Sequence, residues 1–180
     1  MKSQYRDIQS FKFFNSKLMV FAFFIALFLI PNTGFTQDGM TTVIFVRHAE
    51  KGFDEGGDPD LTEAGLKRAK KLAQILNVQT IDRIFTTPFK RTNQTVQPIA
   101  DVKGIKIEEY NPFKIEEAVE LISNSKGQTL LFSGHSNTIP ILINKLLGKD
   151  ELRLIDDDEY DNLFVLTLVN NQAKLITLKY

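Results

Sequence analysis

Residues 43–51 of the chain have the sequence VIFVRHAEK. Four apolar residues, three of them β-branched, run directly into an arginine and a histidine. A continuous apolar run of this kind is typical of a strand buried on both faces, as the strands of a parallel sheet are. We therefore predict a buried strand over residues 42–46 that ends at Arg47 and His48. The chain has only 2 histidines, so the placement of one of them at a strand end needs a chemical explanation.

Outward from this strand, strands and helices are expected to alternate. Thr62 is predicted to cap a helix whose apolar face consists of Leu66, Ala69, Leu72, Ala73 and Leu76. Further strands are expected at residues 81–86, 105–110 and 129–132, and further helices from Pro88 onward, at 115–123 and at 137–147. The alternating runs 163–169 and 173–179 predict a hairpin around Asn170 and Asn171. This order predicts an α/β fold: a three-layer sandwich with a mainly parallel central sheet flanked by helices and a C-terminal hairpin at the sheet edge.

The composition narrows the class of protein. A chain of 180 residues suits one domain with a full core. The formal net charge is zero, so no basic excess indicates nucleic acid as a partner. The absence of cysteine rules out disulfides, thiolate metal sites and a cysteine nucleophile.

The first 36 residues differ in character from the rest. They carry four basic residues and one acidic residue, followed by 13 apolar residues at positions 18–30 (LMVFAFFIALFLI). This run is short for a membrane span and matches the core of a signal peptide. We expect residues 1–36 to be a signal peptide cleaved before Gln37, with an uncleaved N-terminal membrane anchor as the alternative. The expected product, residues 37–180, is a single exported domain, periplasmic or secreted, with 18 basic and 21 acidic residues.

Three predicted strand ends carry the polar residues of interest. Arg47 and His48 follow the first strand, Arg91 lies on the first turn of the helix after the second, and His135 follows the strand at 129–132. In an open parallel sheet, ligands bind at the carboxyl ends of the strands. We therefore predict that these four side chains converge on one pocket.

Such a set of side chains suits phosphoryl chemistry. Guanidinium groups offer forked donors that match the oxygens of a phosphoryl group. A neutral imidazole can attack phosphorus, and a second imidazole can donate hydrogen bonds to the charged oxygens. The arginines supply the positive charge that a metal ion supplies elsewhere, so we expect neither a metal nor a cofactor.

Four segments then carry a family resemblance: VRHAEK at 46–51, LTEAG at 61–65 with Ala69, TPFKRT at 87–92 through Thr95, and GHSN at 134–137. In this order they resemble the histidine phosphatase superfamily, in its phosphoglycerate mutase-like branch. The resemblance implies that His48 is transiently phosphorylated, that Arg47 and Arg91 hold the phosphate, and that His135 completes the pocket. Members usually have glycine after the nucleophilic histidine, where this chain has Ala49.

We expect a metal-independent phosphatase that hydrolyses small phosphomonoesters through a phosphohistidine on His48. Only 39 residues separate Thr95 from His135, which leaves little room for the covering segments that mutase relatives carry. The compact form also resembles protein phosphohistidine phosphatases, which gives an alternative. A second alternative is a catalytically inactive phosphate-binding module. A membrane contact is expected only through the N-terminal segment, if it is uncleaved.

A phosphomonoesterase needs a proton donor for the departing oxygen. Glu109, at the end of the strand at 105–110, is the candidate general acid, and its neighbour Glu108 points to the other face. Other carboxylates that could reach the pocket are Glu50, Asp54, Asp58, Glu159 and Asp161. The acidic run at residues 156–159 is interpreted as a solvated loop and not as a metal site.

Overall fold

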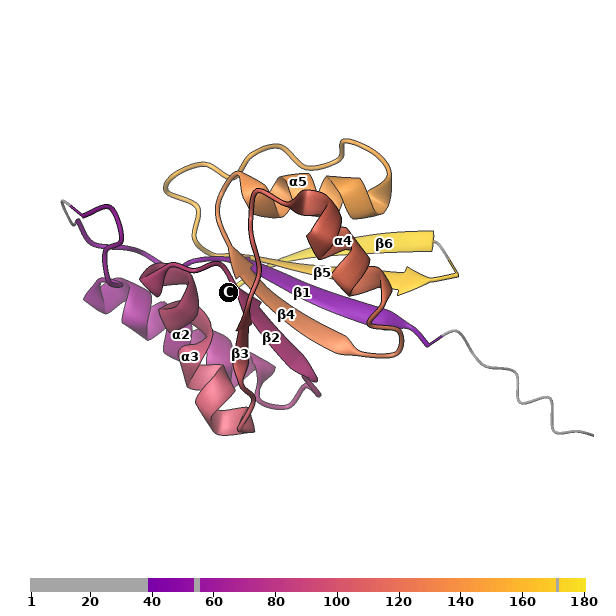
Figure 1. The fold of residues 1–180 in the computed structure, drawn as a ribbon. Helices are drawn as coiled ribbons and strands as arrows, with labels where there is room; N and C mark the ends of the chain where they lie inside the picture. The colour runs from indigo at the N-terminus through magenta and orange to yellow at the C-terminus, as the bar shows by residue number, and fades with distance from the viewer. Residues whose placement is uncertain (1–38, 54–55, 171) are drawn as a thin grey trace, which may run out of the picture. The chain divides into compact units, whose positions relative to one another are not determined.

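The computed structural model describes residues 39–180 except 54, 55 and 171. Within them, a six-stranded sheet has the strand order β3-β2-β4-β1-β5-β6 (Figure 1). Strands β1, β4, β2 and β3 are mutually parallel, whereas β5 runs antiparallel to β1 and to β6. The strands are β1 (Thr41–Arg47), β2 (Arg83–Thr86), β3 (Ile107–Glu109), β4 (Thr129–Gly134), β5 (Asn162–Val169) and β6 (Gln172–Lys179). The mainly parallel sheet with a hairpin at its edge is confirmed.

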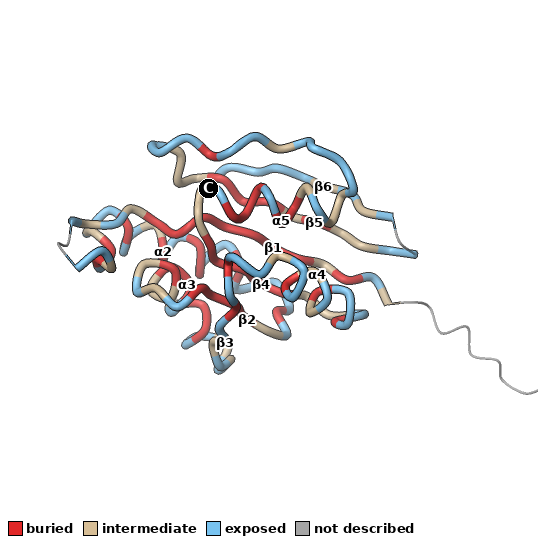
Figure 2. Tube along the Cα trace, turned by 45° about the horizontal axis from the view of Figure 1, so that its top comes forward, coloured by how far each residue is buried: buried red, intermediate tan, exposed pale blue. Residues whose placement is uncertain are grey.

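Helices cover both faces of this sheet. α2 (Glu63–Leu76) and α3 (Lys90–Lys103) lie on one face, and α4 (Ile115–Ser123) and α5 (Thr138–Leu147) lie on the other (Figure 1). Successive residues of a strand point to opposite faces, so Val43 and Phe45 of β1 pack under α4 and α5, while Ile44 and Val46 pack under α2 and α3. β1 and its parallel neighbours are buried along most of their length (Figure 2). The predicted three-layer sandwich is confirmed.

The N-terminus of α2 shows one correct and one wrong prediction. Thr62 caps the helix as expected, because its hydroxyl oxygen accepts a hydrogen bond from the Gly65 amide at 3.1 Å. Leu66, however, is 47% exposed, and Gly65 takes the buried position instead. A Cβ on Gly65 would lie 2.3 Å from the Glu50 carbonyl oxygen. The helix therefore contacts the segment after His48 through a bare backbone, which the apolar periodicity did not indicate.

Several element boundaries also differ from the predictions. α3 begins at Lys90 with Phe89 as its N-cap, so Pro88 precedes the helix instead of lying in its first turn. β3 starts at Ile107, two residues later than expected, because the Ile105 amide donates to the Ala100 carbonyl and closes the end of α3. β2 likewise starts at Arg83, after the predicted residue 81. The predicted helix at 115–123 is confirmed. Gly148 follows α5 in the left-handed conformation and ends that helix.

The predicted signal peptide, residues 1–36, lies outside the described residues. Among the helices described in 39–180, none has the length and hydropathy needed to cross a membrane.

Candidate active site

The parallel pairing of β1 with β4 brings the two histidines together. Arg47 stands opposite Gly134 in the register, and the His48 amide donates to the Gly134 carbonyl at 2.8 Å. His135 follows Gly134, and its ring centroid lies 5.6 Å from that of His48. A Cβ on Gly134 would lie 2.6 Å from the Tyr110 hydroxyl oxygen, so only glycine permits this packing. The predicted convergence of both histidines on one sheet edge is observed.

The tautomer of His48 follows from its hydrogen bond. Its side chain is only 4% exposed, and Nδ1 lies 2.8 Å from the carbonyl oxygen of Ala49. A carbonyl oxygen can only accept a hydrogen bond, so Nδ1 carries the proton. Nε2 of the neutral ring therefore retains its lone pair, which is the state a nucleophilic histidine requires.

Thr95 on α3 fixes the segment around His48. Its hydroxyl group accepts a hydrogen bond from the Ala49 amide at 2.8 Å and donates to the Arg91 carbonyl at 2.7 Å. Thr95 is fully buried. The spacing of Arg91 and Thr95 thus places one helical turn against the residue after His48, which gives the motif RTNQT a structural reason.

A chain of two threonine hydroxyls holds His135. Thr92 Oγ1 donates to the Thr87 and Phe89 carbonyls, Thr87 Oγ1 lies 3.0 Å from Thr92 Oγ1, and His135 Nε2 lies 3.0 Å from Thr87 Oγ1. Because Thr92 gives its proton to a carbonyl, it accepts from Thr87, and Thr87 in turn accepts from Nε2–H of His135. Nδ1 is then the nitrogen of His135 that gains a proton when the ring becomes an imidazolium.

Arg47 is held by backbone carbonyls of a distant loop. Its Nη1 donates to the carbonyl oxygens of Asp156, Asp157 and Glu159 at 2.8, 3.1 and 3.1 Å. Its guanidinium carbon lies 4.2 Å from the ring centroid of Tyr160, and the residue is 4% exposed. Residues 156–158 are exposed as expected, although the Asp157 carboxylate lies 3.8 Å from Arg47 Nη2 and the Asp156 carboxylate pairs with Arg153. The backbone of this run has a role that the sequence did not reveal.

Arg91 is held more loosely. Its Nη1 lies 3.7 Å from Asp58 Oδ1, and its guanidinium carbon stacks 4.3 Å from the Phe89 ring centroid. The Nε groups of both Arg47 and Arg91 are buried without a hydrogen-bond partner among the described residues. Two buried donors of positively charged groups without partners suit an anion, since unpaired buried donors are costly.

The electrostatics of the pocket keep both imidazoles neutral. Burial, with the positive charges of Arg47 and Arg91 and the neighbouring ring, lowers the pKa of His48 to about 3, against the opposing effect of the Ala49 hydrogen bond. Burial and the same two arginines lower the pKa of His135 to about 4. Burial also lowers the pKa of Arg91, with Asp58 opposing the shift. Each of the two arginines thus lowers the pKa of both histidines, as expected of groups that lie close together.

These pKa values predict a loss of stability in acid. In the unfolded chain a histidine gains its proton near pH 6.5, whereas folded His48 gains it only near pH 3. Between these values the unfolded state binds the proton and the folded state does not, so the free energy of unfolding falls as the pH is lowered. At pH 4 the expected cost is about 3 kcal/mol relative to pH 7.

Urea denaturation of the wild type and of His48→Gln at pH 7 and pH 4 measures this cost. From pH 7 to pH 4, the free energy of unfolding of the variant is expected to fall by about 3 kcal/mol less than that of the wild type, because glutamine does not titrate. The titration of the carboxylates contributes equally to both proteins and cancels in this comparison. Stability curves that stay parallel from pH 7 to pH 4 would show that burial does not depress the pKa of His48.

The candidate acids fall into two groups. Glu109 is exposed at the end of β3, opposite Thr86 in the register, and its carboxylate makes no hydrogen bond or ion pair within the described residues. The others are engaged: Glu50 with Arg68, Glu108 with Arg83, Glu159 with Asn162, Asp161 with Lys179, and Asp58 with Arg91 and the Lys90 amide. The hydrogen bonds from Arg68 and Arg83 lower the pKa of Glu50, against its burial, and of Glu108. Asp54 lies outside the described residues.

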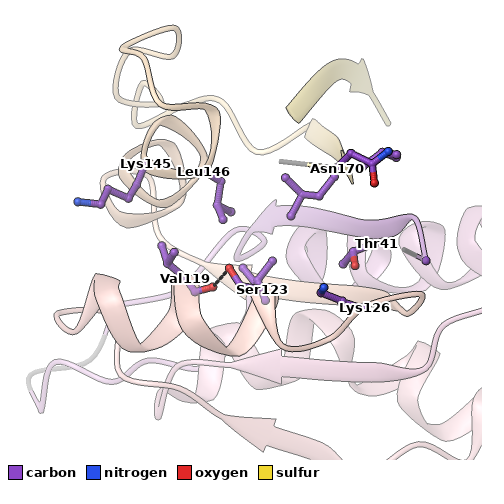
Figure 3. A pocket seen from close by; sticks show the side chains of 11 residues that line it. Thr41, Val119, Ser123, Lys126, Lys145, Leu146 and Asn170 are labelled. Atoms are coloured by element: carbon purple, nitrogen blue, oxygen red, sulfur yellow. Dashed lines mark hydrogen bonds between the residues drawn. The ribbon is translucent and has the colours of Figure 1, made fainter. Parts of the chain in front are cut away.

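A second hollow lies at the opposite edge of the sheet, near the start of β1, and contains neither histidine. Its lining includes Thr41, Ser123, Leu146 and Asn170 (Figure 3). The Ser123 hydroxyl donates to the Val119 carbonyl within its own helix at 2.8 Å. The two histidines and the two candidate arginines therefore lie at the carboxyl ends of the parallel strands, as predicted, and not at this second hollow.

Fold and site together define an α/β domain in which two neutral imidazoles and the guanidinium groups of Arg47 and Arg91 gather at the carboxyl ends of the parallel strands. The family comparison agrees: residues 43–114 match the model of the histidine phosphatase superfamily (branch 1). Phosphoserine phosphatase 1 of Hydrogenobacter thermophilus is 42% identical over 74 residues, a match that spans 38% of this chain and 35% of that protein. Residues 43–114 thus match the histidine phosphatase superfamily, in agreement with the resemblance that the motifs carry.

Solved structures agree on the fold. The protein histidine phosphatase SixA, in complex with tungstate, superposes with a TM-score of 0.61 at 18% identity, over 77% of this chain and 96% of that one. Phosphoserine phosphatase of Entamoeba histolytica, in complex with 3-phosphoglyceric acid, gives a TM-score of 0.61 at 16% identity, over 78% and 97% of the two chains.

Proposed function

We propose that the protein hydrolyses phosphomonoesters through a phosphohistidine on His48. The observation that carries this proposal is the pairing of His48 and His135, with ring centroids 5.6 Å apart, beside the buried Arg47 and the partly buried Arg91, whose charges both lower the pKa of His48. A pocket that only binds phosphate has no need of a buried neutral imidazole with a free Nε2. The match of residues 43–114 to the histidine phosphatase superfamily and the similarity to a phosphoserine phosphatase support the same activity.

The proposed reaction has two displacement steps. In the first, His48 Nε2 forms a bond to phosphorus while the ester P–O bond breaks, and the departing oxygen takes a proton from a general acid. In the second, water attacks phosphorus, the P–N bond breaks, and the proton of the water passes to the base left by the first step. Inorganic phosphate leaves and the neutral His48 is restored.

The cationic groups stabilise the charge that spreads over the phosphoryl oxygens. The unpaired Nε–H groups of Arg47 and Arg91 are the donors proposed to face them. A bound dianion also opposes the arginines that lower the pKa of His135, which favours protonation of its Nδ1 and a further hydrogen bond to the phosphoryl group. We propose that this charge makes a metal ion unnecessary, so turnover is expected to persist after exhaustive treatment with EDTA.

The test is to trap the intermediate. Turnover of 4-nitrophenyl phosphate is quenched rapidly in base, because phosphohistidine survives in base and is hydrolysed in acid. The wild type is expected to carry base-stable, acid-labile phosphate that is absent from His48→Ala. A wild type that turns over without such phosphate would contradict the mechanism. Tight phosphate binding without turnover would instead establish the phosphate-binding module.

Glu109 is the proposed general acid, since it is the candidate carboxylate without a partner among the described residues. It lines the same hollow as Thr87 and Phe89, both of which contact His135. Alkoxide leaving groups need a proton, whereas 4-nitrophenolate does not.

Glu109→Gln is therefore expected to lower kcat/KM for an alkyl phosphate by about 10²-fold and to change it little for 4-nitrophenyl phosphate. Steady-state kinetics of both substrates give the ratio. Glu108→Gln is the matched control, because its carboxylate is occupied by Arg83 at 2.6 Å. Equal losses on both substrates would exclude Glu109 from protonating the leaving group.

Protein phosphohistidine is the alternative substrate. The observation in its favour is the structural likeness to SixA, 96% of which the superposition covers. A phosphoramidate nitrogen leaves more readily than an alkoxide, so an exposed acid such as Glu109 would suffice. A phosphohistidine-bearing peptide turned over faster than alkyl phosphates by the wild type, and equally by Glu109→Gln, would favour this alternative.

We also propose export by residues 1–36, which carry a net charge of +3 before 13 apolar residues. Mass spectrometry of the protein recovered from its cell envelope is expected to give a chain that begins at Gln37. A full-length chain in the membrane fraction would favour the uncleaved anchor.

A further inference from the structure

An apolar hollow of about 360 Å³ lies beside the phosphate pocket. Its apolar lining consists of Pro88, Phe89, Tyr110, Pro112 and Phe113. The hollow adjoins the site through Phe89, whose ring centroid is 5.3 Å from that of His135 and whose face carries the Arg91 guanidinium group. A group bonded to the phosphate therefore has an apolar surface within reach.

The outer wall of the hollow is a turn that holds Phe113 out in solvent. The Tyr110 amide donates to the Thr86 carbonyl at 2.8 Å, which ties the turn to the end of β2. The Asn111 side chain accepts from the Phe113 amide at 2.9 Å, and its carbonyl accepts from the Lys114 amide at 3.2 Å. Phe113 is nonetheless 82% exposed. A large exposed aromatic side chain on a hydrogen-bonded turn beside a pocket has apolar area available for a ligand.

Charge at the rim opposes a second anionic group on the substrate. The neighbouring hollow shares Pro88, Phe89 and Glu109 with the apolar one, and it also contains Asp58 and Asp60. Lys90 is its one basic residue, and its ammonium nitrogen already lies 3.9 Å from Asp60. A substrate carboxylate in this position would meet the carboxylates of the hollow, while the two nearby cations, Lys90 and Arg91, are already paired with Asp60 and Asp58.

We infer that the preferred substrates are phosphomonoesters whose organic group is apolar or aromatic and carries no negative charge. This inference rests on the proposed function and adds the substrate class to it. The phosphate would lie among the two arginines and the two histidines, and the organic group would lie against Phe89 and Phe113. Small carboxylated phosphate esters would be poor substrates because of the acidic rim.

The test compares pairs of phosphate esters whose alcohols have similar acidity, so that cleavage of the P–O bond contributes equally to kcat/KM. 2-Phenylethyl phosphate is expected to exceed propyl phosphate in kcat/KM by about tenfold or more, as burial of a phenyl group predicts. Glycerol 3-phosphate is expected to exceed 3-phosphoglycerate by about tenfold. Ratios near one, or a preference for the carboxylated ester, would overturn the inference.

Phe113→Ala localises the effect. The phenylethyl-to-propyl ratio of kcat/KM is expected to fall by about threefold or more in this variant. The fold is expected to be unchanged, because the side chain is 82% exposed. Val78→Ala is the matched control: Val78 is 84% exposed and lines neither hollow. A ratio that is unchanged in Phe113→Ala would remove Phe113 from the substrate site.

Binding of inert analogues separates this inference from the proposed function. Calorimetry with 2-phenylethylphosphonate and propylphosphonate needs no turnover, and the aromatic analogue is expected to bind about tenfold more tightly. If 4-nitrophenyl phosphate is not hydrolysed but this preference is seen, the proposed function fails and the apolar site stands. If 4-nitrophenyl phosphate is hydrolysed through His48 and the preference is absent, the function stands and the inference fails.

Discussion

Replacing His48 with alanine is expected to lower kcat for 4-nitrophenyl phosphate by on the order of 10⁴-fold, because the group that bonds to phosphorus is lost. The structure supports a loss of this size, since the Nε2 lone pair of His48 is set free by the hydrogen bond from Nδ1 to Ala49. Substrate binding should change far less, because the arginines remain. The measurement is steady-state kinetics, with circular dichroism to show that the variant is folded.

His135→Ala is the matched comparison. His135 is proposed to donate a hydrogen bond to the phosphoryl group, a contribution typically about 10²- to 10³-fold in kcat. The phosphoenzyme should therefore still form in His135→Ala, though slowly, and be absent from His48→Ala. If His135→Ala were the more damaging of the two, or if it alone lacked the phosphoenzyme, the assigned roles would be reversed.

The second large effect concerns the two arginines, which the structure holds in different ways. Arg47→Met and Arg91→Met are each expected to lower kcat/KM by about 10²-fold or more, because each removes a charged donor to the phosphoryl group. Arg47→Met should also lower the free energy of unfolding by about 2 kcal/mol, since it removes the donor to three carbonyls of the loop at residues 156–159.

Arg91→Met should leave stability unchanged or raise it. The Arg91 guanidinium group has a 3.7 Å ion pair to Asp58, an unpaired Nε, and a pKa lowered by burial, so the folded protein without ligand bears an electrostatic cost there. Urea denaturation of both variants gives the comparison. A loss of stability in Arg91→Met equal to that in Arg47→Met would show that the two arginines are held alike.

The main features of the fold could be predicted because they depend on periodicity. The apolar run before Arg47 and the capping residue Thr62 each indicated their element, and the structure agrees. The exceptions have local causes. Leu66 matched the helical period but is exposed, since the bare Gly65 lets the helix rest on the Glu50 carbonyl.

The parts of the site that follow from the ends of strands could be predicted from the sequence. The contacts made by main-chain carbonyls could not. His48 and His135 meet because their strands are parallel neighbours. By contrast, Arg47 is held by carbonyls more than 100 residues away, and a carbonyl is common to all residue types. Tyr160, stacked on Arg47, and Thr87, bonded to His135, were likewise missed. The motif TTPFKRT contains Thr87, but nothing in the sequence indicated which of its threonines faces the histidine.

The grip on Arg47 has an evolutionary consequence. Main-chain oxygens accept these hydrogen bonds from Arg47. The aspartates at positions 156–158 should therefore tolerate replacement, whereas the length of the loop should not change. A deep mutational scan should accept most substitutions at Asp157 and Asp158 and reject single deletions. Homologues are thus expected to differ in sequence in this region while keeping the same backbone contacts to the arginine.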